Sequence, residues 1–283
     1  FRSIITEAEA LLADTPEEDE EGRAFLMAVQ ISSRGIIEWA ERYADLAERE
    51  AEREANSARK AELLRIAATC RRVPAEPARS FTEAIQAFWF VHMAMHIEQY
   101  GWSISAGRFD QYIYPYLRKD LEEGVITEAH AWELLLNLWV KFMENVHTGV
   151  KDTVFQNLTL GGQDKYGNDQ SNALSRMCLE ATAALRFNQP ALSVRWHPGI
   201  DRDFWDQVHQ TIATGLGLPA LFNDDVIIPA LVSHGVDPED AVGYGLVGCV
   251  EASIPGKQQG MTAGGHINCL KALELALNEG RSM

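Results

Sequence analysis

The feature that most constrains the fold is a change of pattern near residue 153, where short β-rich runs begin to alternate with helical runs. The β-rich runs are TVFQNLTLGG, QPALSVRWH, LPALFND and EDAVGYGLVGCVEAS, the last of which leads into a loop. Strands that alternate with helices form βα units and pair in parallel. The pattern therefore predicts an α/β fold for residues 153–283, as part of a sheet or a barrel.

Residues 1–152 have a helical pattern instead, because Ala, Leu, Glu and Arg dominate and apolar residues recur every three to four positions. Ile36, Ala40 and Ala44, for example, fall on one face of a helix. Two prolines in VPAEPARS interrupt this pattern before a strongly apolar helix begins. We therefore expect a mainly helical outer portion at 1–152 and an α/β portion at 153–283, both within one incomplete domain.

The composition excludes several classes of partner. The sequence has 25 Lys and Arg against 41 Asp and Glu, a net charge of −16, which disfavours binding to nucleic acid or to an anionic membrane. No apolar run approaches the roughly 20 residues that cross a bilayer, and the acidic start is unlike a signal peptide. The four cysteines form no CxxC pair, which favours a reducing cytoplasm. Because the chain begins without Met and ends just after a helical pattern, we expect a piece of a longer protein.

Two clusters suggest metal sites but lack a full set of ligands. His92 and His96 share a helix face, as zinc ligands do, but HMAMH has no Glu at its second position and no third ligand is indicated. Buried, hydrogen-bonded histidines are therefore expected. Asp164, Asn168 and Asp169 lack the spacing of a calcium loop, so a surface turn is expected there. The sequence also contains no P-loop and no dinucleotide-binding glycine motif, and we predict no bound metal.

A thiol and a carboxylate two residues apart form the strongest chemical signal. In GYGLVGCVEASIPGK, Cys249 is followed by Glu251, and in an extended chain positions i and i+2 point to the same side. A carboxylate beside a thiol raises the pKa of the thiol, which suits a thiol that reacts by hydrogen-atom transfer rather than as a thiolate. Two alternatives remain open at this point. Cys249 is a small buried core residue, or it is the nucleophile of a thiol hydrolase with His266 as its base.

Several blocks of sequence, taken in order, resemble the middle portion of a glycyl radical enzyme of the pyruvate formate-lyase-like superfamily. The blocks are PARSFTEAIQAFWFVH, SISAGRFDQYIYPY, NLTLGG, QPALSVRWH, LPALFNDD and VGCVEASIPGK. The Gly-Cys-Val-Glu turn is similar to that of the dehydratase, lyase and decarboxylase branches. Pyruvate formate-lyase itself carries two adjacent cysteines here, whereas Gly248 precedes Cys249 in this chain. The glycyl radical motif, of the Arg-Val-x-Gly-Tyr type, is absent from the sequence.

The resemblance implies a fold and a reaction. The family fold is a ten-stranded α/β barrel wrapped in helices, with the active-site cysteine on a central loop. A separate iron–sulfur, S-adenosylmethionine-dependent activating enzyme installs a radical on a glycine near the C-terminus, and the radical passes to Cys249. The thiyl then takes a hydrogen atom from a small substrate, and Glu251 acts as the general base. The resemblance further implies no metal or bound coenzyme in the barrel, a dry cavity, a homodimer, and a location in the cytoplasm or in a bacterial microcompartment.

Four positions are expected to contact the substrate, by comparison with the family patterns. Trp102 and Ser103 precede GRFD, where diol dehydratases carry a His-Ser pair. Thr262 stands where those enzymes carry the first residue of a His-Asp pair, and His266 stands where choline trimethylamine-lyase-like members have Tyr. The first difference weakens the case for glycerol or propanediol. Thr262 and Ala263 match the Thr-Ala of the choline branch, but His266 does not, so the resemblance implies a small substrate that bears a hydroxyl or a carboxylate without fixing which one.

Two further functional alternatives follow from the resemblance. One is an arylacetate-type radical decarboxylase, in which Glu251 would serve the proton of the cysteine. The other is a non-catalytic binding or scaffold protein that keeps the barrel framework. In either case Arg108 and Asp110 of GRFD are expected to form a structural ion pair.

Overall fold

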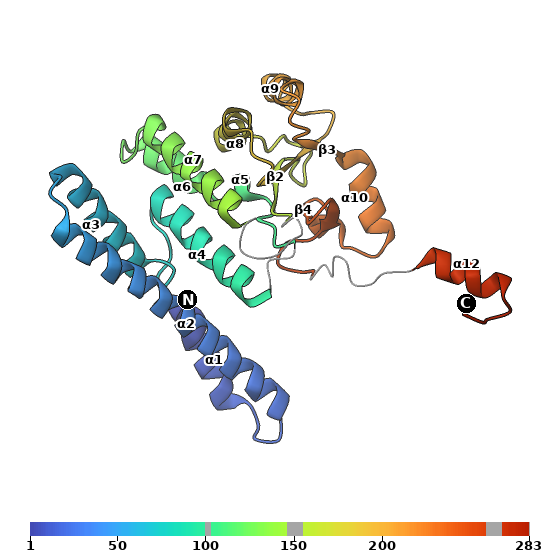
Figure 1. Cartoon of the computed structure of the whole chain (residues 1–283), viewed down its shortest axis with the longest axis horizontal. Helices are drawn as coiled ribbons and strands as arrows, with labels where there is room; N and C mark the ends of the chain where they lie inside the picture. Colours follow the sequence, from blue (N-terminus) through green and yellow to red (C-terminus); the bar gives the residue numbers. More distant parts are fainter. Residues whose placement is uncertain (100–102, 146–154, 259–267, 283) are drawn as a thin grey trace.

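The structure is a computed structural model that describes residues 1–99, 103–145, 155–258 and 268–282. Helices flank a small parallel sheet, and α12 lies at the far end of the chain (Figure 1). The helices are α1 (Arg2–Asp14), α2 (Glu20–Arg53), α3 (Ser57–Arg72), α4 (Phe81–Gln99), α5 (Phe109–Tyr112), α6 (Tyr114–Glu122), α7 (Glu128–Glu144), α8 (Ala173–Leu185), α9 (Arg202–Ala213), α10 (Asp224–Ser233), α11 (Pro238–Ala241) and α12 (Cys269–Leu277). The strands are β1 (Asn157–Gly161), β2 (Ala191–Trp196), β3 (Ala220–Asn223), β4 (Gly245–Val247) and β5 (Glu251–Ser253).

The N-terminal portion is helical, as predicted. The helical pattern of α2 buries Ala40, Ala44 and Ala47, which pack with residues of α3 and with Phe90 of α4. α2 ends at Arg53, and Asn56 caps α3, because its side chain accepts hydrogen bonds from the backbone N–H groups of Ala58 and Arg59. The charged residues of α2 and α3 remain on the solvent side.

The sheet that follows is parallel, in the order β1-β2-β3, which confirms the predicted βα units. One face of the sheet is apolar. Its Leu158, Leu160 and Val194 side chains pack with α7 and α8 in the main core, together with Trp139 and Leu174. This packing buries the faces of both helices and fixes the sheet against them.

The opposite face of the sheet is polar, although parallel sheets are ordinarily apolar on both faces. Because side chains alternate along a strand, Asn157 and Thr159 of β1 and Ser193 and Arg195 of β2 point away from the apolar core. All four are buried. This polar face carries the segment that contains the predicted cysteine.

That segment differs from the fourth parallel strand that the sequence predicts. It forms a hairpin in which β4 pairs antiparallel with β5, and β4 contacts β1 through a bond from the Leu246 N–H to the Thr159 hydroxyl at 2.8 Å. The parallel prediction is wrong because Gly248, with φ at +59°, reverses the chain after only three residues of strand. The described residues thus contribute three parallel strands and one hairpin, and the ten strands of a whole barrel stay a prediction.

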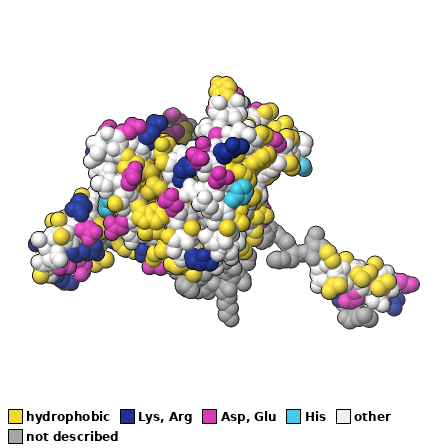
Figure 2. Space-filling view, turned by 90° about the horizontal axis from the view of Figure 1, so that it is seen from above, with side chains coloured by type: hydrophobic (Ala, Val, Ile, Leu, Met, Phe, Trp, Pro, Cys, Tyr) yellow, Lys and Arg dark blue, Asp and Glu magenta, His cyan; other side chains and the backbone are white. Residues whose placement is uncertain are grey.

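Among the described helices, none combines the length and the apolar character needed to cross a bilayer. α12 has no buried residue, and hydrophobic side chains gather on its surface (Figure 2). They include Leu270, Leu273 and Leu277, which are all exposed.

Candidate functional site

The predicted catalytic pair lies at the tip of the hairpin. Cys249 occupies the turn between β4 and β5, and Glu251 is the first residue of β5; both are exposed in this chain. The expectation that an extended backbone aligns the two side chains is wrong, because Cys249 sits in a turn rather than in a strand. The Glu251 carboxylate instead turns back along the hairpin, where its Oε2 atom accepts a hydrogen bond from the Val250 N–H at 3.0 Å.

Gly248 brings Ser103 and Glu251 together beside the cysteine. A Cβ atom added at Gly248 would lie 2.7 Å from Ser103 Oγ and 3.1 Å from Glu251 Oε2. The hydroxyl and the carboxylate therefore both approach the residue directly before Cys249. Ser103 itself has φ at +59°, a left-handed conformation that costs energy for a residue with a side chain and that clusters at functional sites. The predicted substrate residue Ser103 is thus placed at the turn. Trp102, Thr262 and His266 lie outside the described residues.

The sequence alone did not identify two residues, Ser105 and Asn157, that hydrogen-bond to the turn of Cys249. Ser105 Oγ accepts hydrogen bonds from the Gly248 N–H at 2.9 Å and from the Asn157 N–H at 3.1 Å. The Asn157 side-chain amide in turn donates to the Gly248 carbonyl at 3.4 Å. Both residues belong to blocks that resemble the family, but their roles depend on contacts between distant parts of the chain.

The ion pair expected between Arg108 and Asp110 does not form, although the structure describes both residues. Each binds the backbone at the end of β1 instead: Arg108 Nη2 donates to the Gly161 carbonyl at 3.0 Å, and Asp110 Oδ2 accepts from the Gly161 N–H at 2.8 Å. Asp110 also accepts a hydrogen bond from the Ser175 hydroxyl at 2.6 Å. Burial raises the pKa of the Asp110 carboxyl and lowers the pKa of Arg108 to about 10. The two residues are structural, as expected, but through the backbone.

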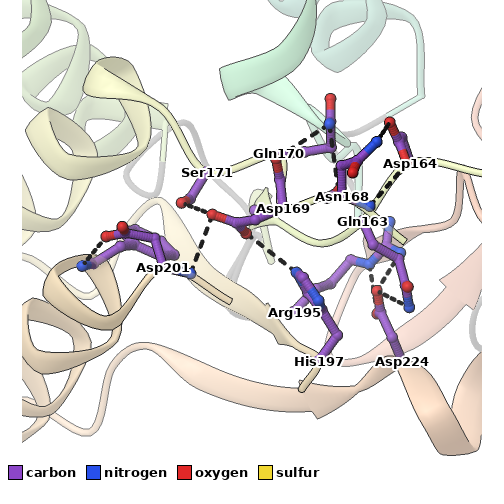
Figure 3. A network of polar contacts seen from close by, with 12 residues as sticks. Gln163, Asp164, Asn168, Asp169, Gln170, Ser171, Arg195, His197, Asp201 and Asp224 are labelled. Carbon is purple, nitrogen blue, oxygen red and sulfur yellow. Dashed lines mark hydrogen bonds and ion pairs between the residues drawn. The ribbon is translucent and has the colours of Figure 1, made fainter. Parts of the chain in front are cut away.

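A buried ion pair connects the sheet to the base of the hairpin (Figure 3). Arg195 of β2 binds Asp224 of α10 in a bidentate manner, with an Nε–Oδ1 distance of 2.8 Å and an Nη2–Oδ2 distance of 2.7 Å. Tyr244, which precedes β4, donates its hydroxyl to Asp224 at 2.7 Å, and its carbonyl accepts from Arg195 Nη1 at 2.9 Å. The hairpin is therefore anchored at its start by Tyr244 and at its tip by Ser105 and Asn157.

The acidic loop before α8 contains Asp164, Asn168 and Asp169. Its first part, at Asp164 and Asn168, forms the predicted turn. Asp164 accepts hydrogen bonds from the backbone N–H groups of Tyr166 and Asn168 and from the Asn168 side chain at 2.9 Å, and the Asn168 bonds lower the pKa of Asp164. Asp169 points inward instead and lies 3.1 Å from His197 Nε2 (Figure 3).

The two histidines of α4 are hydrogen-bonded, as expected. His92 Nε2 lies 2.8 Å from Gln156 Oε1, and His96 Nε2 lies 3.0 Å from His92 Nε2. Burial lowers the pKa of His92 to about 3 and that of His96 to about 4, so both are neutral at pH 7. Across the described ranges, no group of three or more His, Cys, Asp or Glu side chains is arranged to hold a metal ion.

A cavity of about 250 Å³ lies at the base of the hairpin rather than at its tip. Its lining includes Arg108, Tyr112, Asp240 and Lys257, and neither Cys249 nor Glu251 contributes to it. The described residues therefore do not enclose the predicted reaction chamber.

Comparison with known proteins supports the resemblance. The chain matches the family model described as "Pyruvate formate lyase-like" over residues 1–283. It is 41% identical to isethionate sulfite-lyase of Desulfovibrio desulfuricans, over 99% of this chain and 36% of that protein. It thus spans about a third of that relative's length.

Two solved structures have the same fold. A glycyl radical enzyme from Archaeoglobus fulgidus is 39% identical, with a TM-score of 0.87, over 99% of this chain and 37% of that one. The glycerol-bound form of the B12-independent glycerol dehydratase from Clostridium butyricum is 42% identical, with a TM-score of 0.85, over 92% and 34%. The predicted resemblance in fold is confirmed, and the names of these relatives agree with the predicted lyase class. The chain therefore belongs to the pyruvate formate lyase-like family of glycyl radical enzymes.

Proposed function

We propose that this chain supplies the thiyl-bearing turn of a glycyl radical lyase that breaks a carbon–heteroatom bond in a small hydroxylated or carboxylated substrate. One observation carries the proposal: the Ser103 hydroxyl and the Glu251 carboxylate both approach Gly248, directly beside Cys249. A reactive sulfur, a base and a hydrogen-bonding hydroxyl are thereby gathered at one turn of a family member.

The reaction begins when Cys249, after passing its hydrogen atom to the radical glycine, becomes a thiyl. The sulfur takes a hydrogen atom from the substrate carbon that bears the hydroxyl, leaving a carbon radical and a thiol. Glu251 accepts the hydroxyl proton, and the group on the neighbouring carbon leaves with its bonding electron pair. The resulting carbonyl radical takes a hydrogen atom back from the thiol, which regenerates the thiyl and releases an aldehyde or ketone.

The remaining predicted residues and partners fit this scheme. Ser103 can hydrogen-bond a substrate hydroxyl or its leaving group, and Trp102, Thr262 and His266 are proposed to line the rest of the pocket. The scheme requires no metal or coenzyme in the barrel. It requires a radical S-adenosylmethionine activating enzyme, and we propose a homodimer in the cytoplasm or in a microcompartment.

The test uses the full-length protein that contains this chain, activated without oxygen by its activating enzyme. Isethionate, glycerol and propane-1,2-diol are supplied, and the formation of an aldehyde together with sulfite or water elimination is measured. Turnover of one of them is expected in the wild type, and loss of turnover in Cys249→Ala and in Glu251→Gln. Cys269→Ala removes another exposed cysteine of this chain and serves as the matched control, with turnover unchanged.

The other outcomes decide between the alternatives. Turnover that survives Cys249→Ala overturns the proposal. Carbon dioxide released from an arylacetate identifies a decarboxylase. Hydrolysis in air that iodoacetamide blocks identifies a thiol hydrolase. A wild-type protein that forms no glycyl radical under any of these conditions identifies a scaffold.

A further inference from the structure

We infer that Ser105, Asn157 and Thr159 form a polar clamp that positions the turn of Cys249, with Ser105 as its central member. This inference rests on the proposed function for its catalytic consequence. The geometry that supports it is independent of the substrate.

The clamp takes the place of a neighbouring strand. Along the inner side of the hairpin, the Leu246 N–H donates to the Thr159 hydroxyl and the Gly248 carbonyl accepts from the Asn157 side chain. The Gly248 N–H donates to Ser105 Oγ. In a continuous sheet these backbone groups would bond to the backbone of the next strand. Here side chains satisfy them, so the position of the turn depends on three side-chain atoms.

Ser105 is central because one oxygen joins two distant segments. It accepts the Asn157 N–H at the start of β1 and the N–H of Gly248, which is 143 residues away in the sequence. Its own proton goes to the Ser103 carbonyl at 3.1 Å or to the Phe155 carbonyl at 3.3 Å. The same hydroxyl thus ties the peptide before Cys249 to the segment that carries Ser103.

Burial makes these contacts specific. Asn157 is 2% exposed and Thr159 is fully buried, and Ser105 is half-buried. A buried donor that loses its acceptor has no water to replace it, so the backbone must move to find another partner. Movement of the Gly248 peptide moves the sulfur, and hydrogen-atom transfer depends steeply on the distance between the reacting atoms.

The experiment compares Ser105→Ala and Thr159→Val with matched controls in the activated full-length protein. Ser175→Ala removes a buried hydroxyl that donates to Asp110 at 2.6 Å, and Thr182→Val removes a buried hydroxyl that accepts from the Trp139 indole at 3.0 Å. For each variant, the glycyl radical is counted by electron paramagnetic resonance, and kcat per radical and KM are measured. Hydrogen–deuterium exchange of the peptide 245–253 is measured in parallel.

The clamp variants are expected to keep the wild-type radical yield and KM but to lose about tenfold to hundredfold in kcat per radical, with faster exchange at 245–253. Ser105→Thr, which keeps the hydroxyl, is expected to restore kcat. The controls are expected to lose stability without losing kcat. The inference is overturned if the clamp variants match their controls in kcat per radical and in exchange.

Two designs keep the result interpretable. If Ser105→Ala does not fold, the comparison of Thr159→Val with Thr182→Val tests the inference instead. Each of these two substitutions removes one hydroxyl without changing the shape of the side chain. If no tested substrate turns over even in the wild type, the proposed function fails. Hydrogen–deuterium exchange of the peptide 245–253 can then still be compared between Ser105→Ala and Ser175→Ala. Faster exchange in Ser105→Ala alone would show that the clamp holds the turn.

Discussion

Arg195 and Asp224 form a bidentate ion pair whose side chains are completely shielded from solvent, and Tyr244 binds both members, since its carbonyl accepts from Arg195 and its hydroxyl donates to Asp224. The pair joins β2, α10 and the base of the hairpin that carries Cys249. A buried ion pair whose charged groups are all hydrogen-bonded costs little folding stability, but a buried charge that has lost its partner destabilises the fold strongly.

Asp224→Asn should therefore destabilise the protein strongly, by about 3–5 kcal/mol, because Arg195 would remain buried with its charge uncompensated. Chemical denaturation of the full-length protein measures the effect. Asp240→Asn, which breaks the exposed pair with Lys257, is the matched control and should cost less than about 1 kcal/mol. Equal losses in the two variants would contradict the assigned role of burial.

Gly248→Ala should disrupt the turn that carries Cys249. Its φ of +59° disfavours a side chain, and the added Cβ would collide with Ser103 and crowd the Glu251 carboxylate. We expect a stability loss of about 1–3 kcal/mol together with loss of turnover. Gly256→Ala has a similar φ, +77°, but nothing within 4 Å of the added Cβ, so it isolates the backbone cost. If both variants lose turnover alike, crowding at Gly248 is not the cause.

Ser103→Ala should reduce catalysis while leaving the radical in place. Loss of one hydrogen bond to a substrate predicts a fall in kcat/KM of about tenfold to hundredfold. The glycyl radical yield should remain unchanged, because the role proposed for Ser103 follows radical formation. Kinetics of the activated enzyme, combined with spin counting, measures both quantities. An unchanged kcat/KM would remove Ser103 from the substrate site.

The buried His92 should make stability depend on pH. Burial lowers its pKa to about 3, well below the value of 6.5 that it has when exposed, so the folded protein binds fewer protons than the unfolded chain between these values. Stability from this residue is complete above pH 6.5 and is lost as the pH falls, with a slope of up to about 1.4 kcal/mol per pH unit.

Denaturation at several pH values between 7 and 4 measures that slope, and His92→Gln should make it shallower. His130→Gln, which replaces an exposed histidine on α7, is the control. A slope that His92→Gln does not change would show that other groups dominate the acid response.

The sequence predicted the parallel strands correctly because each βα unit is a local pattern. Leu158 and Leu160 alternate with polar residues on β1, and glycines mark the ends of elements. It failed at the hairpin because nothing local indicates that Gly248 reverses the chain rather than extending the strand. The prediction of an ion pair between Arg108 and Asp110 was wrong for a related reason, because both side chains bind Gly161, a partner about 50 residues away.

Cys249 and Glu251 were singled out first by their spacing in an extended chain and then by the family resemblance, and their catalytic role stays a prediction. Extended spacing would have aligned Cys249 with Glu251, whereas the carboxylate reaches the turn by folding back to the Val250 N–H. Ser105 and Asn157 could not be predicted, because their importance appears only when segments far apart in the sequence meet.

The polar face of the sheet has a consequence for how such enzymes diverge. Since side chains rather than a paired strand hold the hairpin, an exchange at position 105, 157 or 159 can shift the reactive sulfur by a fraction of an ångström while the strand register stays intact. If Cys249 is the radical carrier, as proposed, the reach of its sulfur toward different substrate carbons can thus be tuned one residue at a time while the sheet stays constant.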